Sequence, residues 1–152
     1  MDIDLASNDE LFAESRRLRD EVLQLAEQLK HNPLRFSLTN GITMNVEITK
    51  SDLKTIVSKN TQDNRFNVIK NSLAKDIPWF LAHSQYEGWR PVVPGKHPET
   101  AFFAYFSHVQ NVKLYLCVRK IKNTGVFKPY AIIDQMMFEA ESAQILKTKE
   151  PD

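Results

Sequence analysis

The sequence contains little cysteine and no long hydrophobic run. Cys117 is the only cysteine among 152 residues, which excludes an internal disulfide and a zinc site built from several cysteines. The longest apolar stretch, residues 101–106, is much shorter than the roughly 20 residues of a membrane-spanning helix, so we expect no membrane partner. The acidic N-terminus lacks the apolar core of a signal peptide. We therefore expect a cytoplasmic protein, or one delivered into a target cytoplasm.

Motifs of common cofactor, metal and nucleophile sites are also missing. The sequence has no G-x-x-x-x-G-K phosphate loop, no G-x-G-x-x-G, no H-E-x-x-H and no G-x-S-x-G. Asp52, Asp63 and Asp76 do not cluster as metal ligands. We therefore expect neither a metal site nor a bound cofactor. Cys117 is predicted in mid-strand, where an inert thiol is favoured over a nucleophile.

Charge is segregated along the chain, although the net charge is only +1. Residues 88–133 carry seven lysines and arginines against one acid, Glu99, whereas both termini are rich in acids. A basic segment favours an anionic partner. Lysines that solubilise the open face of a sheet would give the same pattern.

The first half of the sequence predicts helices and one hairpin. Ser7 and Glu10 match a capping box, and leucines at helical spacing follow until Pro33 ends the helix, so residues 1–32 form an amphipathic N-terminal segment. This helix either docks on the domain or pairs with a second copy. Asn40-Gly41 between alternating apolar residues predicts a tight hairpin. Helical spacing recurs in residues 49–58 and 64–76, and a further turn is expected at 79–83.

The second half predicts strands at 89–93, 101–109, 112–121 and 128–134. We expect an α+β fold in which N-terminal helices pack on one face of a mainly antiparallel sheet of about four strands. The globular domain would span residues 33–136, and residues 137–152 would form a C-terminal tail. The second face of the sheet would then be open or covered by a ligand.

The turn at Gln110-Asn111 decides which residues share the open face of this sheet. A two-residue turn gives a face of aromatic and basic residues: Phe102, Phe106, His108, Lys113, Tyr115, Cys117 and Arg119. A three-residue loop instead groups Tyr105 and Ser107 with Lys113 and Tyr115. Both registers keep Lys113, Tyr115 and Arg119 together. Such a face suits stacked bases and phosphates, and the alternative is that its rings pack under the helices.

Two of the four histidines lie in the basic half of the chain. His97 follows Lys96 in a loop bounded by proline and glycine, and His108 lies near the end of a predicted strand. Because imidazole titrates near neutral pH, these two residues are candidates for an acid–base pair. A structural role for each histidine is the alternative.

Several segments, in this order, resemble the barnase/EndoU/colicin/RelE-like ribonuclease superfamily. The closest likeness is to versions in phage and mobile-element polyvalent proteins and in bacterial polymorphic toxins. The segments lie within residues 42–134 and are 48–54 (ITKSDLK), 88–91 (GWRP), 95–97 (GKH), 102–108 (FFAYFSH), 112–120 and 130–134 (YAIID).

The resemblance implies a barnase/RelE-like fold with RNA lying across the open sheet face. It also implies metal-independent endoribonuclease activity through the ribose 2′-hydroxyl, with His97 or His108 as base or acid and Arg119 and Lys96 as charge stabilisers. Tyr105, Tyr115 or Tyr130 would hold a base. The strand pattern places no glutamate on this sheet. The full set of predicted RNA-binding residues is Tyr105, Phe106, Lys113, Tyr115, Lys120, Lys122 and Tyr130.

The sequence therefore supports three hypotheses. The first is an endoribonuclease domain, such as a toxin or mobile-element effector. The second is a non-catalytic module of the same fold that binds nucleic acid or a protein partner. The third is an unrelated small α+β interaction domain that dimerises through its first helix. Expected partners are RNA and an inhibitor, immunity or host protein.

Overall fold

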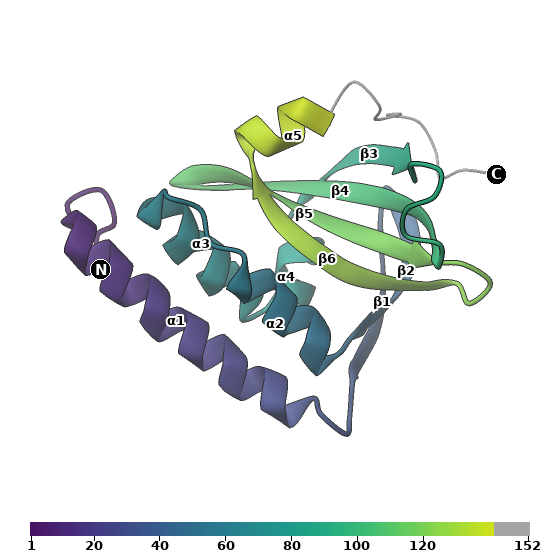
Figure 1. Cartoon of the computed structure of the whole chain (residues 1–152), viewed down its shortest axis with the longest axis horizontal. Helices are drawn as coiled ribbons and strands as arrows, with labels where there is room; N and C mark the ends of the chain where they lie inside the picture. Colours follow the sequence, from purple (N-terminus) through teal and green to yellow (C-terminus); the bar gives the residue numbers. More distant parts are fainter. Residues whose placement is uncertain (142–152) are drawn as a thin grey trace.

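The computed structural model describes residues 1–141, which form an α+β fold as predicted. Helices α1 to α4 lie on one side of a curved sheet, and α5 lies on the other side (Figure 1). The helices are α1 (Asn8–Gln28), α2 (Lys50–Ser58), α3 (Asn64–Ala74), α4 (Ile77–Ala82) and α5 (Gln135–Glu141). The strands are β1 (Leu34–Asn40), β2 (Ile42–Ile48), β3 (Gln85–Pro91), β4 (Thr100–Gln110), β5 (Val112–Ile121) and β6 (Val126–Asp134).

Local sequence signals start and stop the helices as expected. The Ser7 hydroxyl accepts from the Glu10 N–H, and the Glu10 carboxylate accepts from the Ser7 N–H, which completes the predicted capping box of α1. Thr49 and Asp52 form a second capping box at the start of α2.

The apolar stripe of α1 packs against α2 and α3, so this helix docks on the domain. No helix within residues 1–141 is both long and apolar enough to cross a membrane.

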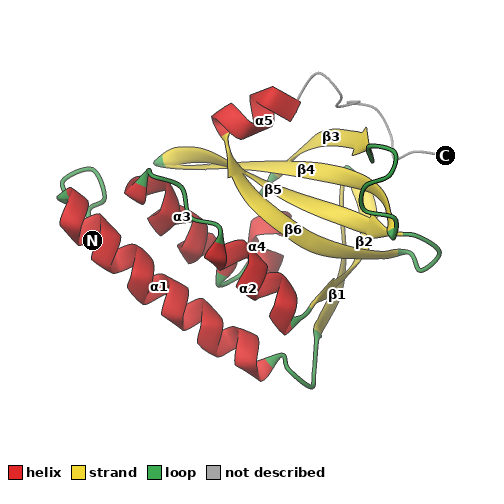
Figure 2. Ribbon diagram, viewed as in Figure 1, coloured by secondary structure: helices red, strands yellow, loops and turns green. Residues whose placement is uncertain are grey.

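The sheet is larger than predicted, and one of its strand pairs is parallel. It has six strands in the order β1-β2-β6-β5-β4-β3 (Figure 2). The predicted hairpin joins the strand meander through a short parallel contact, in which Asn45 pairs with Val126 and Val46 with Phe127. The expectation of about four antiparallel strands was wrong because this pairing links segments some 80 residues apart, which no local pattern reveals.

The turn of the β1–β2 hairpin folds back onto the β3 edge of the sheet. The Asn40 side-chain amide donates to the carbonyls of Leu81 and Ser84, at 2.8 Å each. Gly41 has a φ of +75° and lies against the ring of Tyr86 in β3. The two edge strands are thus drawn toward each other, and the sheet curves around the helices.

The observed register at Asn111 differs from both predicted ones. Val109 pairs with Lys113 and Ser107 with Tyr115, and Asn111 alone reverses the chain with a φ of 61°. The face expected from a two-residue turn is therefore wrong. The open face instead groups Tyr105 and Ser107 with Lys113 and Tyr115, as the three-residue alternative predicted. The observed register and that alternative differ by two residues, and an even shift leaves each side chain on the same face.

Helix α5 crosses the expected domain boundary at residue 136. Its Phe138 is buried in a second apolar cluster on the open face, together with Phe103, Tyr105, Tyr115 and Cys117. The first part of the expected tail therefore packs on the sheet, and residues 142–152 lie outside the described part of the chain.

Candidate functional site

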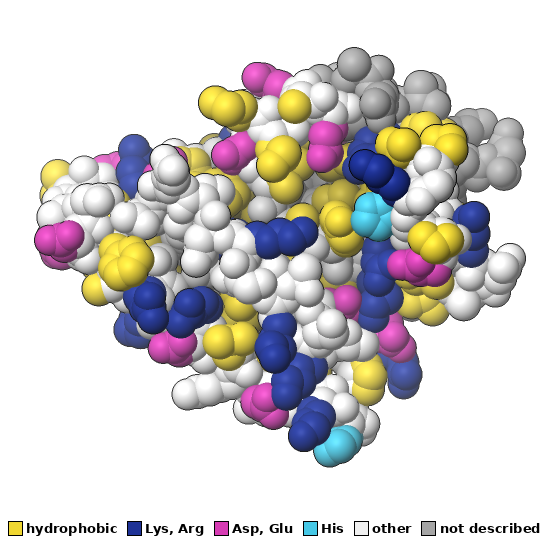
Figure 3. Space-filling view, in the orientation of Figure 1, with side chains coloured by type: hydrophobic (Ala, Val, Ile, Leu, Met, Phe, Trp, Pro, Cys, Tyr) yellow, Lys and Arg dark blue, Asp and Glu magenta, His cyan; other side chains and the backbone are white. Residues whose placement is uncertain are grey.

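A cavity of about 330 Å³ opens along β6, at the edge of the face of the sheet opposite α1–α4, and reaches Phe66 of α3. Its floor is formed by residues 130–133 of β6 and by Cys117 of β5. One wall is the loop 59–61 between α2 and α3, and the other consists of Arg90 with Met137 and Glu141 of α5. This volume is at the lower end of the range for small-ligand pockets. Figure 3 shows apolar side chains recessed on this face, with charged side chains around them.

Aromatic rings and cations meet beside this cavity. The half-buried Tyr130 ring lies 5.2 Å from Phe103 and 5.6 Å from His97, measured between ring centroids. The Lys59 ammonium lies 4.9 Å from the centroid of Tyr130, and the Arg90 guanidinium lies 4.4 Å from that of Phe103. Both distances are in the range of cation–π attraction.

The loop that carries Lys59 is held rigidly by buried polar groups of α3. The Asn67 side chain accepts from the Thr61 N–H at 3.0 Å and donates to the Thr61 carbonyl at 2.9 Å. The ammonium of Lys70, which is fully buried, donates to the Lys59 carbonyl. Burial lowers the pKa of Lys70 to about 8. This wall of the cavity therefore depends on a lysine that is shielded from solvent.

His97, Glu99 and Arg119 form a second group at the same face. The Arg119 guanidinium donates to Glu99 at 3.0 Å and to the Thr100 hydroxyl at 3.4 Å. A backbone hydrogen bond, and then Arg119 and His97, hold the pKa of Glu99 below its usual value. The Glu99 carboxylate is thus paired with the Arg119 guanidinium, and His97, two residues earlier in the same loop, is near enough to influence its pKa.

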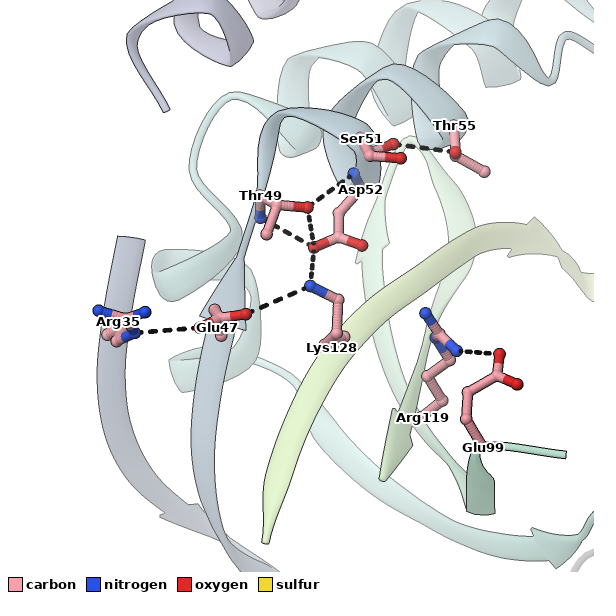
Figure 4. Close-up of polar contacts among 9 residues, drawn as sticks. All are labelled: Arg35, Glu47, Thr49, Ser51, Asp52, Thr55, Glu99, Arg119 and Lys128. Atoms are coloured by element: carbon pink, nitrogen blue, oxygen red, sulfur yellow. Dashed lines mark hydrogen bonds and ion pairs between the residues drawn. The ribbon is translucent and has the colours of Figure 1, made fainter. Parts of the chain in front are cut away.

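A third polar group joins β2, β6 and α2, as Figure 4 shows. The Lys128 ammonium lies 2.8 Å from Asp52 and 3.5 Å from Glu47, and Glu47 also accepts from Arg35 at 3.0 Å. Glu47 is therefore a glutamate on the open face, which the strand prediction had not placed there. The strict alternation of residues 42–48 indicated that Glu47 lies on the polar side of β2. Only the parallel β2–β6 pairing shows that this side of β2 belongs to the open face of the sheet.

Three open-face cations of the basic segment are paired with acids, one of them the segment's own Glu99 and the others from β2, α2 and α5. Arg119 faces Glu99, Lys128 faces Asp52 and Glu47, and Arg90 lies 3.8 Å from Glu141. Figure 3 accordingly shows basic and acidic side chains interspersed on this face. The charge segregation of the sequence is thus not preserved as a large basic patch.

The two histidines predicted as an acid–base pair lie on opposite faces of the sheet. His97 packs edge-on against Phe103 and Tyr130 on the open face. His108 lies on the helix side, with its ring 5.3 Å from Trp79 and its Nδ1 3.2 Å from the His83 carbonyl. The structure therefore does not bring the two imidazoles to one substrate, and the pairing fails on geometry.

The other predicted residues divide between the two faces and the loops. Phe106 is fully buried on the helix side against Tyr86, so it offers no surface for RNA. Lys120 also points to the helix side, with its ammonium 5.7 Å from the Phe102 ring. Lys96 and Lys122 are exposed in loops at the end of the sheet, and Lys113 is exposed near Tyr115.

Tyr105 and Tyr115 lie on the open face, but α5 covers both. Phe138 stacks on Tyr115 with centroids 3.8 Å apart and planes 4° apart, and it contacts Tyr105 edge-on. The Tyr115 hydroxyl donates to the Gln135 side chain at 3.0 Å. The Tyr105 hydroxyl donates to Glu141 and accepts from Arg90. Of the predicted base-holding tyrosines, Tyr130 is thus the one left partly open to solvent.

No protein-family model, curated protein or solved structure matches this chain. Within residues 1–141, no group of three or more histidine, cysteine or carboxylate side chains is placed to hold a metal ion.

Proposed function

We propose that the protein binds single-stranded RNA on the open face of its sheet, with one base in the cavity beside Tyr130. The observation that carries this proposal is the half-buried Tyr130 ring, which lies between the Lys59 ammonium and the rings of His97 and Phe103 at the edge of a 330 Å³ cavity. Proteins that bind single strands combine aromatic platforms for bases with cations for phosphates.

Stacking, rather than net charge, would dominate this binding. Arg119, Lys128 and Arg90 each face a carboxylate, so few cations near the cavity are free to neutralise phosphates. With two phosphate contacts, the logarithm of affinity should fall with the logarithm of salt concentration at a slope of about −1.4. A slope near −3 would indicate four contacts, and would require exposed lysines such as Lys96, Lys113 and Lys122 to take part in binding.

Binding is tested by the fluorescence anisotropy of a labelled octauridylate. Because each stacked base contributes roughly 1–3 kcal/mol, Tyr130→Ala should weaken affinity by about 5- to 150-fold, while Tyr130→Phe keeps the stacking ring and most of the affinity. Trp79→Ala is a matched control, since it removes a 41% exposed aromatic ring on the helix side. Equal losses from Trp79→Ala and Tyr130→Ala, or no binding by the wild type, would overturn the proposal.

Cleavage of the bound RNA is a second candidate, favoured by the meeting of His97, Glu99 and Arg119. In this chemistry the ribose 2′-oxygen bonds to phosphorus as the bond to the 5′-oxygen breaks. Glu99, ionised at neutral pH, would accept the 2′ proton, and His97 in its protonated form would supply one to the 5′-oxygen. Arg119 would stabilise the added negative charge on the phosphorane.

The cleavage candidate is tested with RNA in EDTA. His97→Ala should lower the rate by a factor of about 10²–10⁴, whereas His108→Ala, on the opposite face, should leave it unchanged. The products should carry a 2′,3′-cyclic phosphate, and 2′-O-methyl RNA should resist. Equal losses in both histidine variants would contradict the role given to His97, and no cleavage by the wild type would leave RNA binding without catalysis.

A further inference from the structure

Helix α5 makes unusual contacts for a structural helix. It has seven residues, too few for a stable helix in isolation, so its position depends on what it touches. Phe138 is its only buried residue, and Met136 and Met137 on the same helix are 79% and 52% exposed. The Phe138 ring, together with the polar groups of Gln135 and Glu141, thus attaches α5 to the sheet.

Each of these contacts has the form of a nucleotide contact. The Phe138 ring lies flat on Tyr115, with centroids 3.8 Å apart and planes 4° apart, which is how a base stacks on an aromatic platform. Side chains in apolar cores more often meet offset or edge-on. The Glu141 carboxylate accepts from the Tyr105 hydroxyl beside Arg90, and a phosphate could accept from the same two donors.

The groups beneath α5 are built to receive an anion and a flat ring. Tyr105 is fully buried, and burial, together with Cys117 and Glu141, raises the pKa of its hydroxyl well above the usual value, so that this hydroxyl remains a donor. Arg90 packs on Phe103 at 4.4 Å, which holds its guanidinium in the cavity wall. Met137 and Glu141 form the adjoining wall, so the cavity would lengthen along the sheet if α5 moved away.

We propose that Tyr115, Tyr105 and Arg90 form a second nucleotide position on the open face, which α5 occupies in place of RNA through Phe138 and Glu141. This inference rests on the proposed RNA binding at Tyr130 and extends it to a neighbouring nucleotide of the same strand. The base would stack on Tyr115, and its phosphate would contact Arg90 and the Tyr105 hydroxyl. Helix α5 therefore acts as an intramolecular competitor. Only molecules in which α5 has left the sheet can bind a nucleotide at this second position, so the apparent affinity falls in proportion to their fraction.

The competition is tested by comparing octauridylate affinity in Phe138→Ala and the wild type. Removing the stacked ring should release α5 and tighten binding by roughly three- to tenfold. Met136→Ala is the matched control, because it shortens an exposed side chain of the same helix and should change nothing. Adding Tyr115→Ala to the Phe138→Ala variant should abolish the gain.

The outcomes separate this inference from the proposed function. Binding by the wild type that depends on Tyr130, with no gain in Phe138→Ala, would overturn the competition and leave RNA binding intact. Absence of binding in every variant would overturn both. A second measurement avoids any loss of folding in the variant: saturating octauridylate should speed amide hydrogen exchange in residues 136–141 of the wild type at least severalfold. Unchanged or slower exchange in these residues would show that RNA does not displace α5, and would also overturn the inference.

Discussion

Replacing Gly41 by alanine should destabilise the fold far more than the same change at other glycines of similar backbone conformation. Gly41 has a φ of +75°, a region that costs L-residues about 1–2 kcal/mol. A Cβ at this position would also lie 2.6 Å from the Tyr86 Cβ. That atom is fixed by the β3 backbone, so no change of rotamer relieves the overlap. Overpacking of this kind costs about 1–3 kcal/mol, which gives a total of about 2–5 kcal/mol.

Gly95 and Gly125 are matched controls for this prediction. Their φ angles are +85° and +71°, but an added Cβ would meet nothing within 4 Å. Alanine at either position should therefore cost only the backbone strain, about 1–2 kcal/mol. The measurement is urea unfolding followed by circular dichroism, with the free energy of unfolding compared among the three variants. If Gly41→Ala costs no more than Gly95→Ala, the hairpin turn does not pack on β3 and the described curvature of the sheet is wrong.

Three further predictions follow from buried and paired groups. Because the pKa of Lys70 is lowered to about 8, the unfolded chain holds this proton at higher pH than the folded chain does. Stability should therefore rise between about pH 8 and 10.5, the ordinary pKa of a lysine. Over this window the unfolding free energy of the wild type should rise by roughly 3 kcal/mol relative to that of Lys70→Met. A constant difference between the two proteins would contradict the prediction. Burial raises the pKa of the Cys117 thiol to about 12, so a thiol reagent at pH 7.5 should modify the native protein slowly and Phe138→Ala faster; rapid labelling of the wild type would refute this. Arg119→Gln should leave RNA affinity nearly unchanged, because Arg119 is paired with Glu99, and it should change the unfolding free energy little, because Glu99 is 57% exposed; a large loss of affinity would show that Arg119 leaves Glu99 to contact RNA.

Local features of the fold could be predicted from sequence because each is encoded within a few residues. The capping box at Ser7 and the Asn40-Gly41 turn are of this kind, and both lie where they were expected. Helical and strand periodicity likewise placed most helices and strands close to their observed bounds, although β3 starts at Gln85, four residues before the predicted strand.

Features that depend on distant segments could not be predicted in the same way. The parallel β2–β6 contact, the approach of Gly41 to Tyr86 and the stacking of Phe138 on Tyr115 each join parts of the chain that no local pattern connects. The pairing of β4 with β5 around Asn111 is an example, since a shift of one residue in this register exchanges the two faces of a strand.

The candidate site shows the same division between local and distant information. The sequence indicated that Lys113, Tyr115 and Arg119 share a face, which the structure confirms. It could not show that Asp52 and Glu47 neutralise Lys128, or that Glu99 pairs with Arg119, because these carboxylates come from other elements. The pairing of His97 with His108 was wrong because one lies in a loop that folds over the open face and the other points toward α4.

Photo-crosslinking tests the central claim, RNA binding on the open face, most directly. An octanucleotide that contains 4-thiouridine is irradiated with the wild-type chain, and the attachment sites are located by mass spectrometry. Crosslinks to Tyr130, Phe103 and the loop 59–61 are the predicted result, with Tyr115 added in Phe138→Ala. Crosslinks confined to α1 or to the helix-side surface around Trp79 and His108, or none at saturating protein, would contradict the assignment of the open face as the RNA-binding surface.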